Sequence, residues 1–326
     1  MWFAHLGGTI LAKIVVVGSL NMDVVAFAAR IPVPGETIFG HSFLTAPGGK
    51  GANQAFACAR LAGSTAMLGR VGDDEFGRQL RDNLQRAGCD VGGIGTVQGS
   101  SGVALIFVAD TGQNSIVVVP GANAKFFPED IAASANSFLG TQIVLLQLET
   151  PLDTVRAAAR AGKNANARVI LDPAPADPKC VELFPFLDIV TPNETEAAIL
   201  AGASPSRLDP REAVAVARKL QGEGAGVVIV KLGEQGCVLV EGGEALLMSA
   251  PKVNAVDTTA AGDVFNAGLA VALSEGMNLP DACGYANCAA AISVTRPGAQ
   301  GAAPSRTDVE VFARSSFLAG PIRISS

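Results

Sequence analysis

Short apolar runs alternate with segments of helical spacing along most of the chain. Five runs rich in Val, Ile and Leu end in polar or glycine-rich turns, at 13–23, 141–149, 167–175, 187–196 and 226–236. Apolar positions recur at helical spacing between several of them, at 151–162, 194–201 and 209–222. This alternation predicts an α/β fold with a central, mostly parallel sheet covered by helices on both faces. Ligands of such sheets bind at the carboxyl ends of the strands, where the polar residues of these runs fall.

Two segments depart from this pattern. Residues 24–49 and 102–123 alternate apolar and polar positions around turn residues and are typical of antiparallel hairpins. They predict either a small separate sheet that acts as a lid, with segments at about 22–48 and 100–122, or an extension of the main sheet at its edge. Since no repeat or linker interrupts the pattern, we expect a single domain over 13–315, preceded by an N-terminal extension at 1–12.

Composition narrows the possible functions. The 326 residues are 49% hydrophobic and carry a net charge of −6, which argues against nucleic acid or an anionic membrane as the main partner. Six cysteines form no C-x-x-C pair and only two histidines occur, so a zinc site or a His-dependent triad is not expected. Reduced, buried thiols predict a cytoplasmic protein, and no apolar run reaches membrane length.

A glycine-rich segment, GGKGANQ, begins at Gly48 and leads into a helical pattern. It is not a phosphate-binding P-loop, because that motif requires Gly where the chain has Leu44 and Ser or Thr where it has Gly51. Its glycines let the backbone approach a ligand closely, and Asn53 and Gln54 add amide donors and acceptors. These groups suit a neutral polyol such as a sugar, although the segment could also be a simple helix start.

A second segment, 253–276, places a carboxylate where a turn of small residues becomes an apolar helix. The N–H groups at a helix start are unpaired and partly positive, so a phosphate could lie against Ala260, Ala261 and Gly262. We expect Asp263 to stay ionised there, because the helix end favours the charged form. It could then accept a proton from a hydroxyl that attacks phosphorus. The alternative is that Asp263 only caps the helix.

Both segments carry the signatures of a known family. DTTAAGDVFNAG (257–268) and GGKGANQA (48–55) resemble the two signatures of the phosphofructokinase-B family of sugar kinases. The stretches GSLNMD, GVALIFV, QLE, TPNETEA, AVALSEG and AAAISVTRPGAQG follow the family's order, so that the resemblance covers roughly 13–315. It implies a ribokinase-like three-layer sandwich with a small β-sheet lid. It also implies ATP-dependent phosphorylation of D-ribose at O5 to ribose 5-phosphate.

The resemblance implies roles for individual positions. Asp263 matches the catalytic base, and Ala260, Ala261 and Gly262 match the anion hole. The sugar contacts would be Asp263 together with Asn21, Asp23, Gly49, Lys50, Asn53 and Glu149. The nucleotide contacts would be Asn193, Lys231, Gly233, Gly262 and Asn287, and Lys231 stands where Thr is common in the family.

The resemblance also implies two metal ions. Glu196 matches a residue that holds Mg²⁺ through water, although an acidic first turn of a helix would explain it equally well. The K⁺ loop would comprise Asp257, Thr259, Ser293, Arg296 and Gly298, while Ala302 stands where a Ser ligand is sometimes found.

Two alternative functions remain open, and we expect a second copy of the chain as a partner. A related kinase could act on deoxyribose, another sugar or a nucleoside, since small changes in hydroxyl contacts switch such preferences. A catalytically silent sugar-binding protein on the same fold is the second alternative. Family members commonly form homodimers through the lid strands, and the apolar faces of 24–27 and 116–119 would permit this here.

Overall fold

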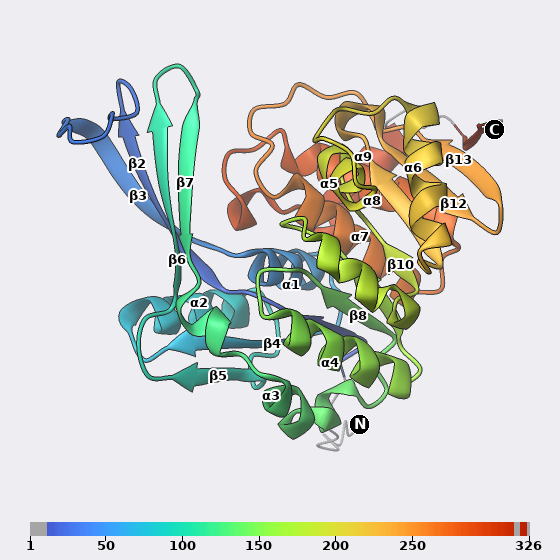
Figure 1. The fold of residues 1–326 in the computed structure, drawn as a ribbon, viewed down its shortest axis with the longest axis horizontal. Helices are drawn as coiled ribbons and strands as arrows, with labels where there is room; N and C mark the ends of the chain where they lie inside the picture. The colour runs from blue at the N-terminus through green and yellow to red at the C-terminus, as the bar shows by residue number, and fades with distance from the viewer. Residues whose placement is uncertain (1–11, 316–319, 325–326) are drawn as a thin grey trace, which may run out of the picture.

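The computed structural model describes residues 12–315 and 320–324, so almost all of the expected N-terminal extension lies outside the described residues (Figure 1). A ten-stranded sheet forms the centre. Its strands lie in the order β14 (Ile322–Arg323), β13 (Glu244–Met248), β12 (Cys237–Glu241), β11 (Val227–Lys231), β10 (Ile189–Val190), β9 (Arg168–Leu171), β8 (Ile143–Leu146), β1 (Ile14–Val17), β4 (Thr65–Gly72) and β5 (Ile94–Val97). The strands from β5 to β11 are parallel, whereas β12, β13 and β14 are antiparallel.

Both faces of this sheet are buried, because successive side chains of a strand point to opposite faces. In β1, Ile14 and Val16 pack into one apolar core while Val15 and Val17 pack into the other. The first core is covered by α1 (Lys50–Arg60), α2 (Glu75–Arg86), α7 (Ala261–Ser274), α8 (Leu279–Ser293) and α9 (Arg306–Ser315). The second is covered by α3 (Pro128–Ala133), α4 (Leu152–Asn164), α5 (Glu194–Leu200) and α6 (Pro210–Gly222). The predicted three-layer α/β sandwich is confirmed.

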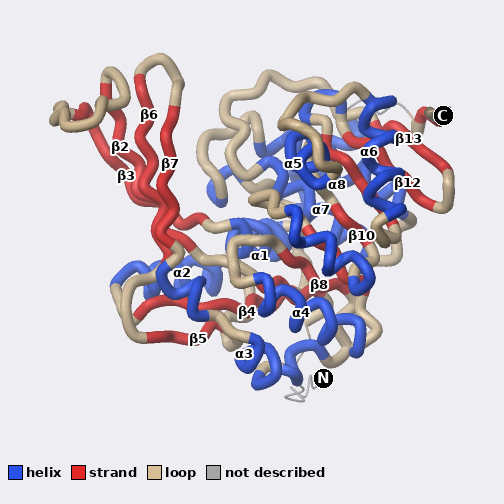
Figure 2. The backbone as a smooth tube through the Cα atoms, in the orientation of Figure 1, coloured by secondary structure: helices blue, strands red, loops and turns tan. Residues whose placement is uncertain are grey.

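A second sheet of four strands projects from this core, at the upper left of Figure 1. Its order is β3 (Gly40–Gly48), β2 (Asn21–Ala28), β6 (Gly102–Ala109) and β7 (Asn114–Val119). Both predicted hairpins are confirmed, since β2 pairs with β3 and β6 with β7 in antiparallel fashion. The hairpins join through a parallel pairing of β2 with β6. An extension of the main sheet is therefore wrong, because the two sheets share no strand (Figure 2).

The register of the small sheet assigns its side chains to two faces. Asn21 pairs with Gly48 and Gly102, and Asp23 pairs with Ala46 and Ala104, so these polar residues share one face, which also carries the exposed apolar side chains of Leu44, Ile116 and Val118. The opposite face carries large apolar side chains that are exposed in the monomer: Phe43, Leu105, Phe107, Val117 and Val119. We call these five residues the apolar lid face.

The helices predicted from spacing are confirmed to within two residues at either end, in α4, α5 and α6. The strands β4, β5 and β14 and the hairpin of β12 and β13 were not predicted from the sequence, although Gly242 and Gly243 between β12 and β13 are a typical hairpin turn. Within the described part of the chain, no helix is long and apolar enough to cross a membrane.

Candidate active site

A cavity of about 380 Å³ opens at the carboxyl ends of β9, β10 and β11, against the start of α7. This is the edge of the parallel sheet where ligands are expected. Nine residues identified in the sequence line it: Lys50, Asn193, Glu196, Lys231, Gly233, Ala260, Ala261, Gly262 and Asp263. Asp172, Ala174, Glu194, Thr195 and Thr258 complete the lining.

The start of α7 carries the three residues identified as an anion hole, and all three line the cavity. Ala260 precedes the helix with φ +58°, a left-handed conformation that is rare outside glycine. The N–H of Ala261 donates to the carbonyl of Thr258, at 3.2 Å. A side chain on Gly262 would come within 3.3 Å of Lys231 Nζ, so the ammonium lies beside the first turn. The first turn of α7 and the lysine therefore border the same cavity.

Asp263 is nearly fully buried, with 5% of its surface exposed, and both carboxylate oxygens accept hydrogen bonds from α1. Asn53 Nδ2 donates to Oδ2 at 3.0 Å, and Gln54 Nε2 donates to Oδ1 at 3.1 Å. The carboxylate is therefore held by another helix and aimed into the site, which is not the arrangement expected if Asp263 only capped α7. Asn53, predicted to bind sugar, contacts the carboxylate in this structure.

The pKa of Asp263 differs from the expectation that the helix end would keep it low. Burial raises the pKa to about 6, and nearby Asp172 adds to this shift. Lys50 and the two amide donors oppose it. The helix end is a weaker influence than burial because the carboxylate has lost its solvent. Asp263 is still mostly ionised at neutral pH, and its basicity lies closer to that of an effective general base.

Lys50 is the cation at the centre of the site. Burial alone would lower the pKa of its ammonium group, but four surrounding carboxylates together raise it above its ordinary value: Asp263, Asp172, Glu149 and Glu196. Lys50 therefore stays charged at neutral pH, and it stabilises the carboxylates around it.

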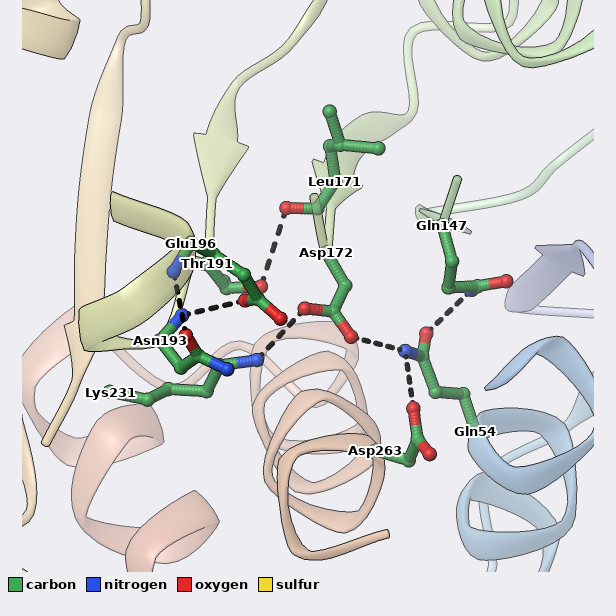
Figure 3. Close-up of polar contacts among 9 residues, drawn as sticks. All are labelled: Gln54, Gln147, Leu171, Asp172, Thr191, Asn193, Glu196, Lys231 and Asp263. Atoms are coloured by element: carbon green, nitrogen blue, oxygen red, sulfur yellow. Dashed lines mark hydrogen bonds and ion pairs between the residues drawn. The ribbon is translucent and has the colours of Figure 1, made fainter. Parts of the chain in front are cut away.

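A polar network that the sequence analysis did not identify runs behind the cavity (Figure 3). Asp172, which follows β9, accepts from Lys231 Nζ at 2.8 Å and from Gln54 Nε2 at 3.0 Å. Gln54 Oε1 in turn accepts from Gln147 Nε2, at 2.7 Å. The available signal was the position of Asp172 at the carboxyl end of a predicted strand.

The glycine-rich segment before α1 needs its glycines. Gly49 has φ +88° and a side chain there would lie 2.7 Å from the backbone nitrogen of Asn21, so only glycine fits. Glu149 Oε2 accepts from Ser19 Oγ at 2.5 Å and from the Lys50 N–H at 3.0 Å. One oxygen of Glu149 thus holds the loop in place, which leaves the other for a ligand.

The two sugar-binding candidates from β2, Asn21 and Asp23, lie on the same face of the small sheet. Asn21 is buried, and its Oδ1 accepts from Asn123 Nδ2 at 2.7 Å, so its own amide N–H₂ is the group it can offer to a ligand. Asp23 occupies space that a side chain on Gly48 would fill, at 2.4 Å from Oδ2. Burial, with a smaller contribution from Glu149, raises the pKa of Asp23 to about 6.

Asn193 and Glu196 form a capping box at the start of α5. Asn193 Oδ1 accepts from the Glu196 N–H, and Glu196 Oε2 accepts from the Asn193 N–H, both at 2.8 Å. The structural explanation of this acidic first turn is therefore correct. Both residues also line the cavity, and burial, with Asp172 nearby, raises the pKa of Glu196 although Lys231 opposes it. One carboxylate oxygen can cap the helix while the other faces a ligand.

The segment identified as a K⁺ loop is closed by Asp257. Its Oδ1 accepts from the N–H and hydroxyl of Thr259, at 2.9 and 2.6 Å, and its Oδ2 accepts from the Gly298 N–H at 2.8 Å. Burial alone would raise the pKa of Asp257, but these hydrogen bonds together lower it. The side chains of Ser293 and Arg296 turn elsewhere: Ser293 donates to the Ala290 carbonyl and Arg296 to Asp308. Arg296 can therefore contribute only its backbone carbonyl, and the Ser293 hydroxyl has already donated its hydrogen to the backbone of α8.

Asn287 is the predicted nucleotide residue that lies apart from the cavity lining. It is buried in α8, where its amide donates to the Met248 carbonyl at 2.9 Å. Within residues 12–315 and 320–324, no three His, Cys, Asp or Glu side chains gather closely enough to bind a metal ion. A divalent ion here would need water and a bound phosphate among its ligands, as is usual for Mg²⁺.

Known proteins share this sequence and fold. Residues 11–306 match the model of the pfkB family of carbohydrate kinases. Ribokinase from Haemophilus influenzae is 39% identical over 298 residues, which are 91% of this chain and 97% of that protein. Deoxyribokinase from Salmonella typhi is 38% identical over 294 residues, 90% of this chain and 95% of that protein. The structure of ribokinase from Arabidopsis thaliana, complexed with ribose and ATP, superimposes with a TM-score of 0.86 at 35% identity, over 93% of this chain and 99% of that one.

These similarities extend over nearly the whole chain and include the two segments beside the cavity, 48–55 and 257–268. The chain belongs to the pfkB family of carbohydrate kinases.

Proposed function

We propose that this protein transfers the γ-phosphoryl group of ATP to O5 of D-ribose and releases ADP and ribose 5-phosphate. One observation supports this most directly: a buried carboxylate, Asp263, lies in the first turn of a helix whose first residues line a cavity of about 380 Å³. A base for a hydroxyl and a site for a phosphate thus lie side by side. The ribokinase and deoxyribokinase relatives support a pentose as the acceptor.

Asp263 acts as the base. It accepts the proton of the ribose 5-hydroxyl as O5 forms its bond to the γ-phosphorus. At the same time the bond between the γ-phosphorus and the β–γ bridging oxygen breaks, and that oxygen leaves as part of ADP. Asn53 and Gln54 hold the carboxylate in one orientation, which limits the reorganisation needed when the hydroxyl arrives. Its pKa of about 6 keeps it ionised before the reaction and basic enough to take up the proton.

Charge on the transferred group is stabilised by the start of α7 and by the lysines. Ala260, Ala261 and Gly262 line the cavity and offer their N–H groups to the phosphate, and Lys231 Nζ lies beside Gly262. Asn193 and Gly233 line the nucleotide side, and Asn287 contributes from α8, outside the cavity lining. These donors are in place before the nucleotide arrives, so they stabilise the transition state without rearranging.

Ribose is bound between the small sheet and α1. Asn21, Asp23 and Glu149 offer an amide and two carboxylates to its hydroxyls, and Gly49 lets the ring approach the backbone. Lys50 adds a cation on the same side. The small sheet covers this site as a lid and excludes water, which would otherwise compete with O5 for the phosphoryl group.

Two metal ions complete the proposal. The carboxylate of Glu196 suits a water-mediated Mg²⁺, which supplies neutralising charge for the phosphates when bound. The loop closed by Asp257, with Thr259 and Gly298, suits K⁺, because its carboxylate ties two backbone segments together through the N–H groups of Thr259 and Gly298 and adds a negative charge. Ser293 and Arg296 take part through their backbone.

Two copies of the chain associate through the apolar lid face. Phe43 is 74% exposed and Val117 is 56% exposed, on the side of the small sheet opposite Asn21 and Asp23. Contiguous exposed apolar surface of this kind marks an interaction site. A cytoplasmic location accords with the six cysteines, all of which are free and buried.

The base assignment predicts the effect of Asp263→Asn. The variant should lose at least about 10³-fold in kcat, because an amide cannot accept the proton, while ribose still binds. Turnover is followed as ribose-dependent ADP release and binding by calorimetry. Asp82→Asn, at an exposed position of α2, is the matched control and should keep wild-type activity. Near-normal turnover of Asp263→Asn would remove Asp263 from the mechanism.

The raised pKa values of Asp263 and Asp23 predict that the reaction rate falls at acid pH. Because Asp263 works as the carboxylate, kcat should be flat above about pH 7 and fall below pH 6, approaching about tenfold per pH unit. The kcat/KM for ribose should fall more steeply, up to about a hundredfold per unit, since Asp23 also becomes protonated near pH 6. Initial rates from pH 4.5 to 8.5 test this. A flat profile to pH 5 would contradict both assignments.

The substrate assignment is tested with a panel of D-ribose, 2-deoxy-D-ribose, D-fructose and nucleosides, assayed for ADP release with KCl and with tetramethylammonium chloride. Ribose should give the highest kcat/KM, at least about tenfold above 2-deoxyribose, because a missing hydroxyl leaves a buried polar group unpaired. Rates should be higher with K⁺. A deoxyribose optimum would favour the function of the Salmonella typhi relative. Ribose binding without ADP release would indicate a silent sugar-binding protein.

The dimer is tested by Phe43→Asp in sedimentation equilibrium. A charge at this exposed position should convert a wild-type dimer to monomer without unfolding it, because the side chain contacts little in the monomer. Val311→Asp, on the exposed side of α9, is the control and should remain dimeric. A monomeric wild-type protein, or a dimeric Phe43→Asp variant, would refute this interface.

A further inference from the structure

We infer that Asp172 is a positioning residue for the phosphoryl transfer, holding Lys231 against the phosphate site with one oxygen and Gln54 against Asp263 with the other. The inference rests on the proposed function and extends it to a residue outside both signatures of the chain. It also assigns Lys231 to the terminal phosphate end of the nucleotide.

Asp172 is almost completely buried, with 3% of its surface exposed, and its oxygens have different partners. Oδ1 accepts from Lys231 Nζ at 2.8 Å, and Oδ2 accepts from Gln54 Nε2 at 3.0 Å. The side chain of Lys231 is itself only 12% exposed. Burying such a pair costs desolvation energy that the attraction often fails to recover, so it is weak evidence for stability. Its place between the cavity and the base points to a role in catalysis.

Lys231 is directed along the cavity wall toward α7. Its Nζ lies 3.3 Å from where a side chain on Gly262 would begin, so glycine at this position leaves room for the ammonium. An ammonium has three donors, and Asp172 uses one. The other two are available to oxygens of a phosphate bound at the start of α7. Without Asp172, the four rotatable bonds of the Lys231 side chain would leave its ammonium group without a fixed position.

Gln54 connects Asp172 to the base, Asp263, through two hydrogen bonds. Its Nε2 carries two hydrogens, one donated to Asp172 and one to Asp263 Oδ1, at 3.0 and 3.1 Å. Its Oε1 accepts from Gln147, so every side of the amide is engaged and rotation is prevented (Figure 3). A neutral amide between two buried carboxylates satisfies both while keeping them apart. The Asp172 carboxylate therefore sets the distance between Lys231, the cation beside the phosphate, and Asp263, the base beside the sugar.

The test compares Lys231→Met, Asp172→Asn and the double variant in steady-state kinetics. Lys231→Met should lower kcat about 10²-fold, the loss typical of one preorganised donor to developing charge, and raise the KM for ATP without changing the KM for ribose. Asp172→Asn should likewise lower kcat and raise the KM for ATP without changing the KM for ribose. The double variant should be no worse than the more damaged single variant, since both changes disable one unit. Lys231→Arg should retain more activity than Lys231→Met.

Two controls separate this role from folding and from the proposed function. Lys163→Met removes a lysine from a 2.7 Å ion pair with Asp188 at the opposite edge of the sheet, and should leave every parameter unchanged. Calorimetry with AMP-PNP and with ADP, at saturating Mg²⁺, requires no turnover. Lys231→Met and Asp172→Asn should weaken AMP-PNP binding more than ADP binding. Thermal melting confirms that each variant is folded.

The outcomes are distinguishable. If the wild type forms no ADP with any sugar while the variants selectively weaken AMP-PNP binding, the proposed function fails and the placement of Lys231 stands. If the wild type is an active kinase but the losses of the two single variants add in the double variant, Asp172 and Lys231 act separately and the inference is wrong. Equal weakening of AMP-PNP and ADP, or an unchanged kcat in Lys231→Met, would also overturn it.

Discussion

The buried carboxylate at Asp263 is the constraint around which the site is built. A charged group with 5% of its surface exposed is unfavourable unless donors and a cation compensate for the lost water. Asn53 and Gln54 supply the donors, and Lys50 supplies the positive charge. The compensation is incomplete, which raises the pKa to about 6 and leaves a base suited to neutral pH.

The sheet topology brings these groups together. Parallel strands end at one edge, so the residues after β9, β10 and β11 face a common space although they are far apart in sequence. The start of α7 borders that space with small residues, Ala260, Ala261 and Gly262, which leave the backbone accessible. A chain with a net charge of −6 can therefore bind a polyanion, because helix geometry and two lysines provide a local positive field.

Structural and catalytic explanations of one residue prove compatible at several positions. Asn193 and Glu196 cap α5 and also line the cavity. Glu149 holds the loop before α1 with one oxygen and keeps the other for a ligand. A carboxylate has several acceptor positions, so a structural hydrogen bond does not exhaust it. Such residues place the site on rigid elements and leave little of it to mobile loops.

Local patterns in the sequence determined five strands of the main sheet, the helices α4, α5 and α6, the two hairpins of the small sheet and the two segments that lead into α1 and α7, because hydrophobic period and turn chemistry act over a few residues. Gly49 and the small residues before Asp263 were recognisable for the same reason. The tertiary structure alone decided the parallel pairing of β2 with β6, the dominance of burial over the helix end in the pKa of Asp263, and the network through Asp172. Each of these depends on groups that are distant in sequence and meet only when the sheet assembles, so no local pattern records them.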